Sequence, residues 1–302
     1  MQISMFDGSQ PFKIDKPIRL IELFAGIGAQ AKALENLGAN FERYRAVEID
    51  KYAVKSYNSI HGTNFDPMDI TKIHAEDLAV IDTDKYCYIM TYSFPCQDLS
   101  VAGKQSGMAK GSGTRSGLLW EVERLLTEIY RGGQGLPNCL LLENVPEVIG
   151  KKNIKHFAEW VKFLDELGYK SKWELLNAKD FGVPQNRNRC FMVSVLGDYY
   201  YEFPEKIPLT KRLKDLLEDK VDEKYYLSNK AFEYIVKREG RYTQLCDDKT
   251  QIAKSAITDG GNCNWTGNFI KDKPVSNAFR GGAVQSLKLW KSLSFMTIIT
   301  AE

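Results

Sequence analysis

The sequence lacks most of the features by which metal sites, disulfide frameworks and membrane proteins are recognised. It has six cysteines and three histidines among 302 residues, and no two cysteines form a C-x-x-C pair. A zinc site and a disulfide framework are therefore not expected. No run of about eighteen apolar residues is present, and the first residues lack the apolar segment of a signal peptide. We expect a cytoplasmic protein that binds no metal and enters no membrane.

A strong excess of one charge is also missing. The formal net charge is only +2, so binding to a polyanion has to come from local clusters of basic side chains. Hydrophobic residues make up 43% of the chain, which is enough to build a substantial core. The length suits one large domain or two smaller ones.

Short apolar runs alternate with amphipathic segments over the first two thirds of the chain. This alternation is typical of a doubly wound α/β fold with a mostly parallel sheet. The pattern weakens after residue 197, so we predict a first domain over residues 1–196 and a smaller, irregular region over residues 197–302. Strands are predicted at 18–26, 44–50, 86–94, 138–145, 169–178 and 189–197. Helices are predicted at 29–38, 51–62, 116–133 and 153–168.

Glycines and acidic residues after the first strands are placed to hold a nucleoside. The run "FAGIG" contains Phe24, Gly26 and Gly28 directly after the first strand. Such a turn lets the backbone approach a ligand closely at a helix N-terminus. Glu48 ends the second strand, where an acid accepts hydrogen bonds from a ribose. Asp69 follows at a place suited to an adenine amino group. Taken singly, these features also fit a plain turn and solvated acids.

A lone cysteine stands in "FPCQ", beyond the carboxyl end of another predicted strand. Ligands of open α/β sheets bind at this edge. Cys96 is followed by a loop rich in glycine and serine, of the kind that closes over a substrate. A small buried hydrophobic residue is the alternative. That alternative is retained for Cys87 and Cys139, which lie inside strands.

Two further polar groups follow apolar runs. Glu143 comes directly after three leucines, and such apolar neighbours favour a carboxyl that can donate a proton. Gln185, Arg187 and Arg189 alternate in "QNRNR", so in an extended strand they share one face, suited to phosphate and base-edge contacts. A solvated edge strand is the alternative.

The segments "FAGIG", "EID", "FPCQ" with "GKQSG", "ENV" and "QNRNR" resemble, in order and spacing, the motifs of the cytosine-C5 DNA methyltransferases. The resemblance covers residues 18–196. It implies an S-adenosylmethionine-dependent, Rossmann-like fold. It also implies methyl transfer to C5 of a cytosine flipped out of double-stranded DNA, in the setting of restriction and modification. We expect a monomer.

The resemblance also implies a role for each motif. Cys96 is the nucleophile that adds to C6, Glu143 contacts N3 and the amino group of the base, and Arg189, supported by Arg187, holds the base carbonyl. The residues implied in DNA contact are Gln97, Ser100 and Gln185. The residues implied in cofactor binding are Phe24, Gly26, Gly28, Glu48, Asp69 and Ile70.

The sequence departs from the family pattern in three places. Glu22 stands where aspartate is usual, and Ala29 replaces a second glycine. The closing "R-x-L-T-x-x-E" and "G-N-[SA]-V" segments are not found, and residues 280–290 are only a faint echo of them. We therefore expect residues 197–302 to be a target-recognition region that is incomplete at its C-terminus. A silent member that binds DNA or cofactor, and a tRNA methyltransferase, remain alternatives.

Overall fold

The computed structural model describes residues 9–96, 99, 108–111, 113–133, 135–211 and 215, and the backbone of four later strands. These residues fall into two compact units. The first holds the described residues up to Leu176 together with Arg189–Pro204, and the second holds Asn177–Asn188 and the described residues from Glu205 onward. The predicted boundary at residue 196 stays a prediction. The contacts group Asn177–Asn188 with the second unit, although these residues precede that boundary.

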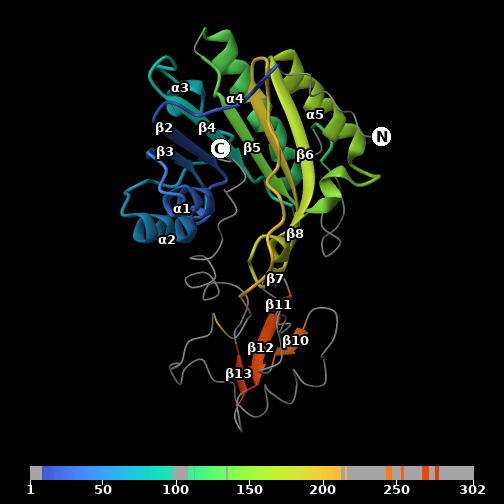
Figure 1. Ribbon diagram of the computed structural model, residues 1–302. Coiled ribbons are helices and arrows are strands. Elements are labelled where there is room, and N and C mark those ends of the chain that lie inside the picture. The colour runs from blue at the N-terminus through green and yellow to red at the C-terminus, as the bar shows by residue number, and fades with distance from the viewer. Residues whose placement is uncertain are drawn as a thin grey trace. The chain divides into compact units, whose positions relative to one another are not determined.

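A six-stranded sheet forms the centre of the first unit, in the order β3-β2-β4-β5-β8-β6 (Figure 1). Strands β3, β2, β4 and β5 are parallel neighbours, whereas β8 runs antiparallel to β5. The predicted mostly parallel α/β fold is confirmed. The strands are β2 (Ile18–Leu23), β3 (Phe41–Val47), β4 (Cys87–Tyr92), β5 (Cys139–Asn144), β6 (Tyr169–Asn177) and β8 (Asn188–Leu196). Short β1 (Gln10–Pro11) pairs with β9 (Tyr199–Tyr200).

Helices connect the strands, and four of the five described lie where the apolar spacing predicts them. The five are α1 (Ala29–Asn36), α2 (Lys51–His61), α3 (Ala75–Leu78), α4 (Leu119–Arg131) and α5 (Ile154–Glu166). The short α3 was not predicted. Single 3₁₀ turns occur at η1 (Arg115–Leu118), η2 (Pro146–Ile149) and η3 (Ala178–Asp180). The helix predicted from Ser116 starts as η1, because Ser116 and Gly117 are weak helix formers. The Thr114 hydroxyl caps that turn by accepting from the Gly117 N–H at 3.1 Å.

The core of the first unit lies between the sheet and the apolar faces of α4 and α5. On α4 the buried residues Val122, Leu125, Leu126 and Ile129 recur at the spacing of one helix face. On α5, Trp160 is fully buried and its indole N–H donates to the Tyr92 hydroxyl at 3.1 Å. Each such buried side chain contributes about 1.5–3 kcal/mol of transfer free energy. These contacts fix the strands whose ends carry the candidate site.

The second unit is described mainly by its strands. Strand β7 (Gln185–Asn186) pairs in parallel with β11 (Ala253–Lys254). A separate sheet has the order β10-β12-β13, with β10 (Thr243–Cys246), β12 (Gly267–Lys271) and β13 (Ser276–Ala278).

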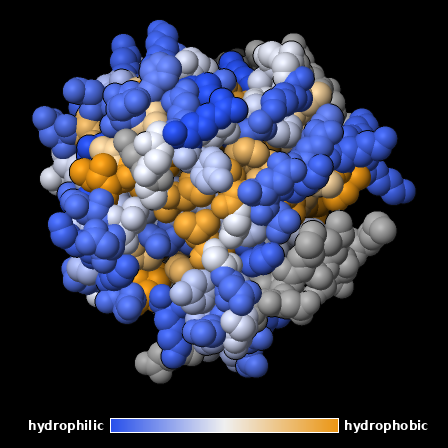
Figure 2. All heavy atoms as spheres, turned by 90° about the horizontal axis from the view of Figure 1, so that it is seen from above, coloured by the Kyte–Doolittle hydropathy of each residue, from blue (hydrophilic) through white to orange (hydrophobic). Residues whose placement is uncertain are grey.

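The surface in Figure 2 has apolar side chains gathered at the centre of one face, within a rim of hydrophilic ones. No helix in the described part of the chain is both long and apolar enough to cross a membrane.

Candidate active site

The ends of four neighbouring strands meet at the carboxyl edge of the parallel part of the sheet. Because the strands are in register, the segments that follow them lie along this edge. They are the glycine turn after β2, Glu48 after β3, Cys96 after β4 and the Glu143–Asn144 pair at the end of β5. The register pairs Leu23 with Val47, Leu23 with Tyr92, and Tyr92 with Leu142.

The glycine turn contains three residues with positive φ angles, a conformation that residues other than glycine rarely adopt. Gly26 and Gly28 have φ angles of +57° and +80°, and Phe24 also has a positive φ of 57°. A side chain at Gly28 would collide with the His61 imidazole and the Tyr57 ring, whereas a Cβ at Gly26 would meet nothing within 4 Å. Gly28 is therefore required by packing, and Gly26 leaves open space beside the turn.

Glu48 is tied to this turn by its carboxylate. Its Oε2 accepts from the Gly26 N–H at 2.9 Å, and its Oε1 accepts from the Asp50 N–H at 2.9 Å. Asp50 has a different task, because its side chain caps α2 by accepting from the Tyr52 N–H at 2.7 Å. Between them Ile49 is 67% exposed. Sequence reasoning missed Ile49, although an apolar residue between two acids was a signal.

Glu22 supports the same turn from inside the sheet. Its side chain is fully buried and accepts from the Tyr57 hydroxyl at 2.5 Å and from the Ala31 N–H at 3.1 Å. Burial raises the pKa of the Glu22 carboxyl to about 7, against the opposing effect of these hydrogen bonds. A carboxyl inside an apolar strand was the sequence signal for this role.

The segment with Asp69 is attached to Glu48 through the backbone. The Met68 N–H donates to the Glu48 carbonyl at 2.8 Å. The Asp69 carboxylate accepts from the Thr71 hydroxyl at 2.8 Å and from the Thr71 N–H at 3.0 Å, and these bonds lower the pKa of Asp69. Ile70 is only 5% exposed. Little of the Ile70 side chain is therefore available to a ligand.

Cys96 is partly exposed, and the residues before it are held firmly. The Asn144 amide donates to the Phe94 carbonyl at 3.0 Å, and the Ser116 hydroxyl donates to the Pro95 carbonyl at 2.8 Å. The "ENV" asparagine thus links the ends of β5 and β4. Gln97 and Ser100 lie outside the described residues.

The other cysteines with described side chains are poor candidates for a nucleophile. Cys87, Cys139 and Cys190 are buried. Burial raises the pKa of the Cys87 thiol to about 11 and that of the Cys190 thiol to about 12, and it also raises the pKa of Cys139. A neutral thiol reacts slowly because the thiolate is the nucleophile.

Glu143 lies against a cation. Arg189 Nε is 3.1 Å from Glu143 Oε1, and both side chains are about four fifths buried. The antiparallel direction of β8 makes this possible, because it pairs Glu143 with Phe191 and returns the start of β8 to the carboxyl edge. The result is a cysteine and an acid–arginine pair at the ends of adjacent strands.

Comparison with known proteins agrees with this arrangement. The sequence profile of the family described as C-5 cytosine-specific DNA methylase matches residues 18–281. The chain belongs to this family.

Its relatives include the type II methyltransferase M2.ScrFI of Lactococcus lactis subsp. cremoris. The two are 37% identical over 224 residues, which is 74% of this chain and 53% of the relative. The orphan methyltransferase M.SssI of Spiroplasma monobiae is 34% identical over 268 residues, which is 71% of this chain and 68% of the relative. The chain thus spans about half to two thirds of the length of these relatives.

Solved structures show the same fold. The Dnmt2 methyltransferase of S. pombe matches with a TM-score of 0.61 at 22% identity, over 83% of this chain and 75% of that one. A DNMT2 mutant of Spodoptera frugiperda matches with a TM-score of 0.62 at 20% identity, over 85% and 75%. At these identities the likeness concerns the fold alone.

The "QNRNR" segment of the chain is not one extended strand. The Arg187 N–H donates to the Gln185 carbonyl at 3.0 Å, which closes a tight turn between β7 and β8. The Arg187 carbonyl in turn accepts from the Ala178 N–H at 3.0 Å. The condition for Gln185, Arg187 and Arg189 to share one face is therefore not met. Their roles in binding stay predictions.

Proposed function

We propose that this chain methylates C5 of cytosine in double-stranded DNA, using S-adenosylmethionine as methyl donor and Cys96 as nucleophile. One observation supports the proposal above all. Cys96 follows β4, and the Glu143–Arg189 pair lies at the end of the adjacent strand β5, on the same sheet edge as the glycine turn and Glu48.

The residues beside the glycine turn fit S-adenosylmethionine. The Glu48 carboxylate is fixed by two backbone N–H groups, and its remaining lone pairs suit the two hydroxyls of a ribose. Open space at Gly26 admits the ligand to the backbone. Ile49 offers an exposed apolar side chain to one face of the adenine. When bound, the cofactor supplies an electrophilic methyl group.

The remaining steps belong to the residues of this chain. C5 of cytosine is a weak nucleophile, and addition of the Cys96 thiolate to C6 makes it enamine-like. Glu143 donates to N3 while charge builds on the ring, and Arg189 holds both the acid and the base carbonyl. After C5 has taken the methyl group, its proton passes to solvent. The electron pair of that C5–H bond re-forms the C5–C6 double bond and expels the Cys96 thiolate from C6, while N3 returns its proton to Glu143. A reduced thiol is required throughout, which supports action in the cytoplasm.

The target carbon is not accessible inside a stacked duplex. The base therefore has to rotate out of the helix, at a cost of a few kcal/mol. Gln97, Ser100 and Gln185 are the proposed contacts to DNA, with Arg187 beside Arg189. The second unit is proposed to recognise the target sequence.

The test is a covalent trap on DNA that contains 5-fluorocytosine at random positions. Fluorine at C5 cannot leave as a proton, so one turnover fixes the enzyme on the base. We expect a protein–DNA adduct on a denaturing gel that requires S-adenosylmethionine. Cys96→Ala should remove the adduct, whereas the matched control Cys87→Ala should retain it. An adduct that persists in Cys96→Ala, or forms on RNA in preference to DNA, would overturn the proposal.

A further inference from the structure

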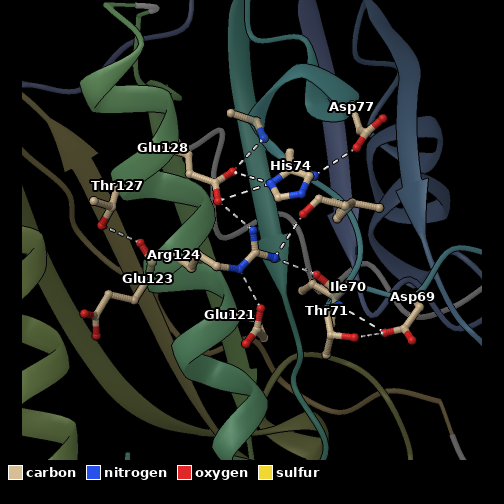
Figure 3. Close-up of polar contacts among 12 residues, drawn as sticks. Asp69, Ile70, Thr71, His74, Asp77, Glu121, Glu123, Arg124, Thr127 and Glu128 are labelled. Carbon is tan, nitrogen blue, oxygen red and sulfur yellow. Dashed lines mark hydrogen bonds and ion pairs between the residues drawn. The ribbon is translucent and has the colours of Figure 1, made fainter.

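The side chain of Arg124 joins α4 to the loop that carries Asp69 and Ile70. Figure 3 shows its guanidinium at the centre of this network. Nη2 donates to the carbonyl of Ile70 at 2.9 Å and to that of Ile73 at 3.0 Å. In the sequence this loop lies between α2 and α3 and has little regular structure of its own.

Two carboxylates on α4 orient this guanidinium. Arg124 Nε donates to Glu121 at 2.8 Å, and Nη1 donates to Glu128 at 2.8 Å. Partly exposed pairs of this kind add little stability by themselves. Here they fix the plane of the guanidinium, so that its remaining nitrogen, Nη2, points at the two loop carbonyls.

Glu128 fixes the other end of the same loop. Its Oε2 accepts from the Ala75 N–H at 3.1 Å, at the start of α3, and lies 3.3 Å from His74 Nδ1. The Arg124–Glu128 pair therefore hydrogen-bonds to both ends of the loop from Ile70 to Ala75 (Figure 3). Ile70 and Ile73 are each only 5% exposed, so water has little access to these two carbonyls and the Arg124 guanidinium satisfies them instead.

We propose that Arg124 is a positioning residue for recognition of the adenine of the cofactor. With the Ile70 carbonyl held by Arg124, the Ile70 N–H and the Asp69 carboxylate are set to meet the ring nitrogen and the amino group of adenine. This inference rests on the proposed use of S-adenosylmethionine. Arg124 itself does not touch the reacting atoms.

The experiment compares two ligands by calorimetry, S-adenosylhomocysteine and S-inosylhomocysteine. The inosyl ligand replaces the amino group with oxygen and protonates the ring nitrogen, so it removes both adenine contacts. We expect the native chain to prefer the adenosyl ligand. Arg124→Met and Arg124→Lys should each reduce this preference roughly tenfold, the equivalent of about one hydrogen bond. Lysine keeps the charge but cannot bridge two carbonyls and two carboxylates.

Arg131→Met is the matched control, since Arg131 is exposed on the same helix and should keep the preference. In turnover, Arg124→Lys should raise KM for the cofactor and leave kcat within about twofold. An equal loss for both ligands would show general damage to the fold and overturn the inference, as would an unchanged preference. If the native chain binds neither ligand, the proposed cofactor is wrong, and this inference falls with it.

Discussion

The buried carboxyl of Glu22 makes a quantitative prediction about the stability of the first unit. Raising the pKa of this group from 4.5 to about 7 costs its ionised form about 3 kcal/mol, since one pKa unit is about 1.4 kcal/mol. Between these two pH values the folded chain holds a proton that the unfolded chain has lost. Stability contributed by this group is therefore present at low pH and falls as pH rises through about 7.

Glu22→Gln removes this titration while it keeps the size and an acceptor of the side chain. The free energy of unfolding of the native chain, minus that of the variant, should fall by about 2–3 kcal/mol between pH 5 and pH 8. Burial lowers the pKa of the neighbouring His61, whose contribution has the opposite sign. Because His61 is present in both proteins, its effect cancels in the difference.

The assay is denaturant unfolding at several pH values, followed by the fluorescence of buried tryptophans such as Trp160. Glu42→Gln, which changes an exposed carboxyl on the adjacent strand β3, is the matched control. Tyr57→Phe should steepen the pH dependence, because the lost hydroxyl favours the ionised form of Glu22. Parallel profiles for the native chain and Glu22→Gln across pH 5–8 would refute the reasoning.

Three further substitutions test the edge of the sheet. Gly28→Ala should destabilise the chain by about 2–4 kcal/mol, because alanine is strained at a positive φ and its Cβ would collide with His61 and Tyr57. Thermal or denaturant unfolding measures this loss, and an unchanged midpoint would contradict the prediction. Glu48→Ala should weaken S-adenosylhomocysteine binding at least tenfold in calorimetry, since it removes the ribose contact. DNA affinity should not change, and a parallel loss of DNA binding would argue against a cofactor role. Glu143→Gln should slow methyl transfer in a single-turnover assay roughly 10²–10⁴-fold, and a rate near that of the native chain would exclude this acid.

Local sequence patterns were sufficient for the six strands of the central sheet and for α1, α2, α4 and α5, but not for the short elements α3, β1 and β9. The apolar runs at β2, β4 and β5 are buried because parallel strands are covered on both faces. The stop of α2 at Gly62 follows from its left-handed conformation, with φ of 64°.

Contacts between distant segments could not be predicted in the same way. The antiparallel direction of β8 depends on the path of the chain, and only that direction brings Arg189 to Glu143. The burial of Ile70 and the hydrogen bond from Arg124 to its carbonyl likewise depend on how α4 packs against this loop. The alternation of Gln185, Arg187 and Arg189 in the sequence suggested an extended strand. The chain instead turns at Arg187, because the Arg187 N–H donates to the Gln185 carbonyl.

The pairing of β7 with β11 bears on how the second unit can be exchanged between members of the family. The second unit is assembled from two separate stretches of chain, and β7 belongs to the stretch enclosed between β6 and β8. A recombinant that replaces only the residues after Pro204 would give β7 a foreign partner in place of β11. A transferable second unit therefore has to include Asn177–Asn188 together with the later stretch, or the receiving protein has to supply a β7 that pairs with β11 in the same register.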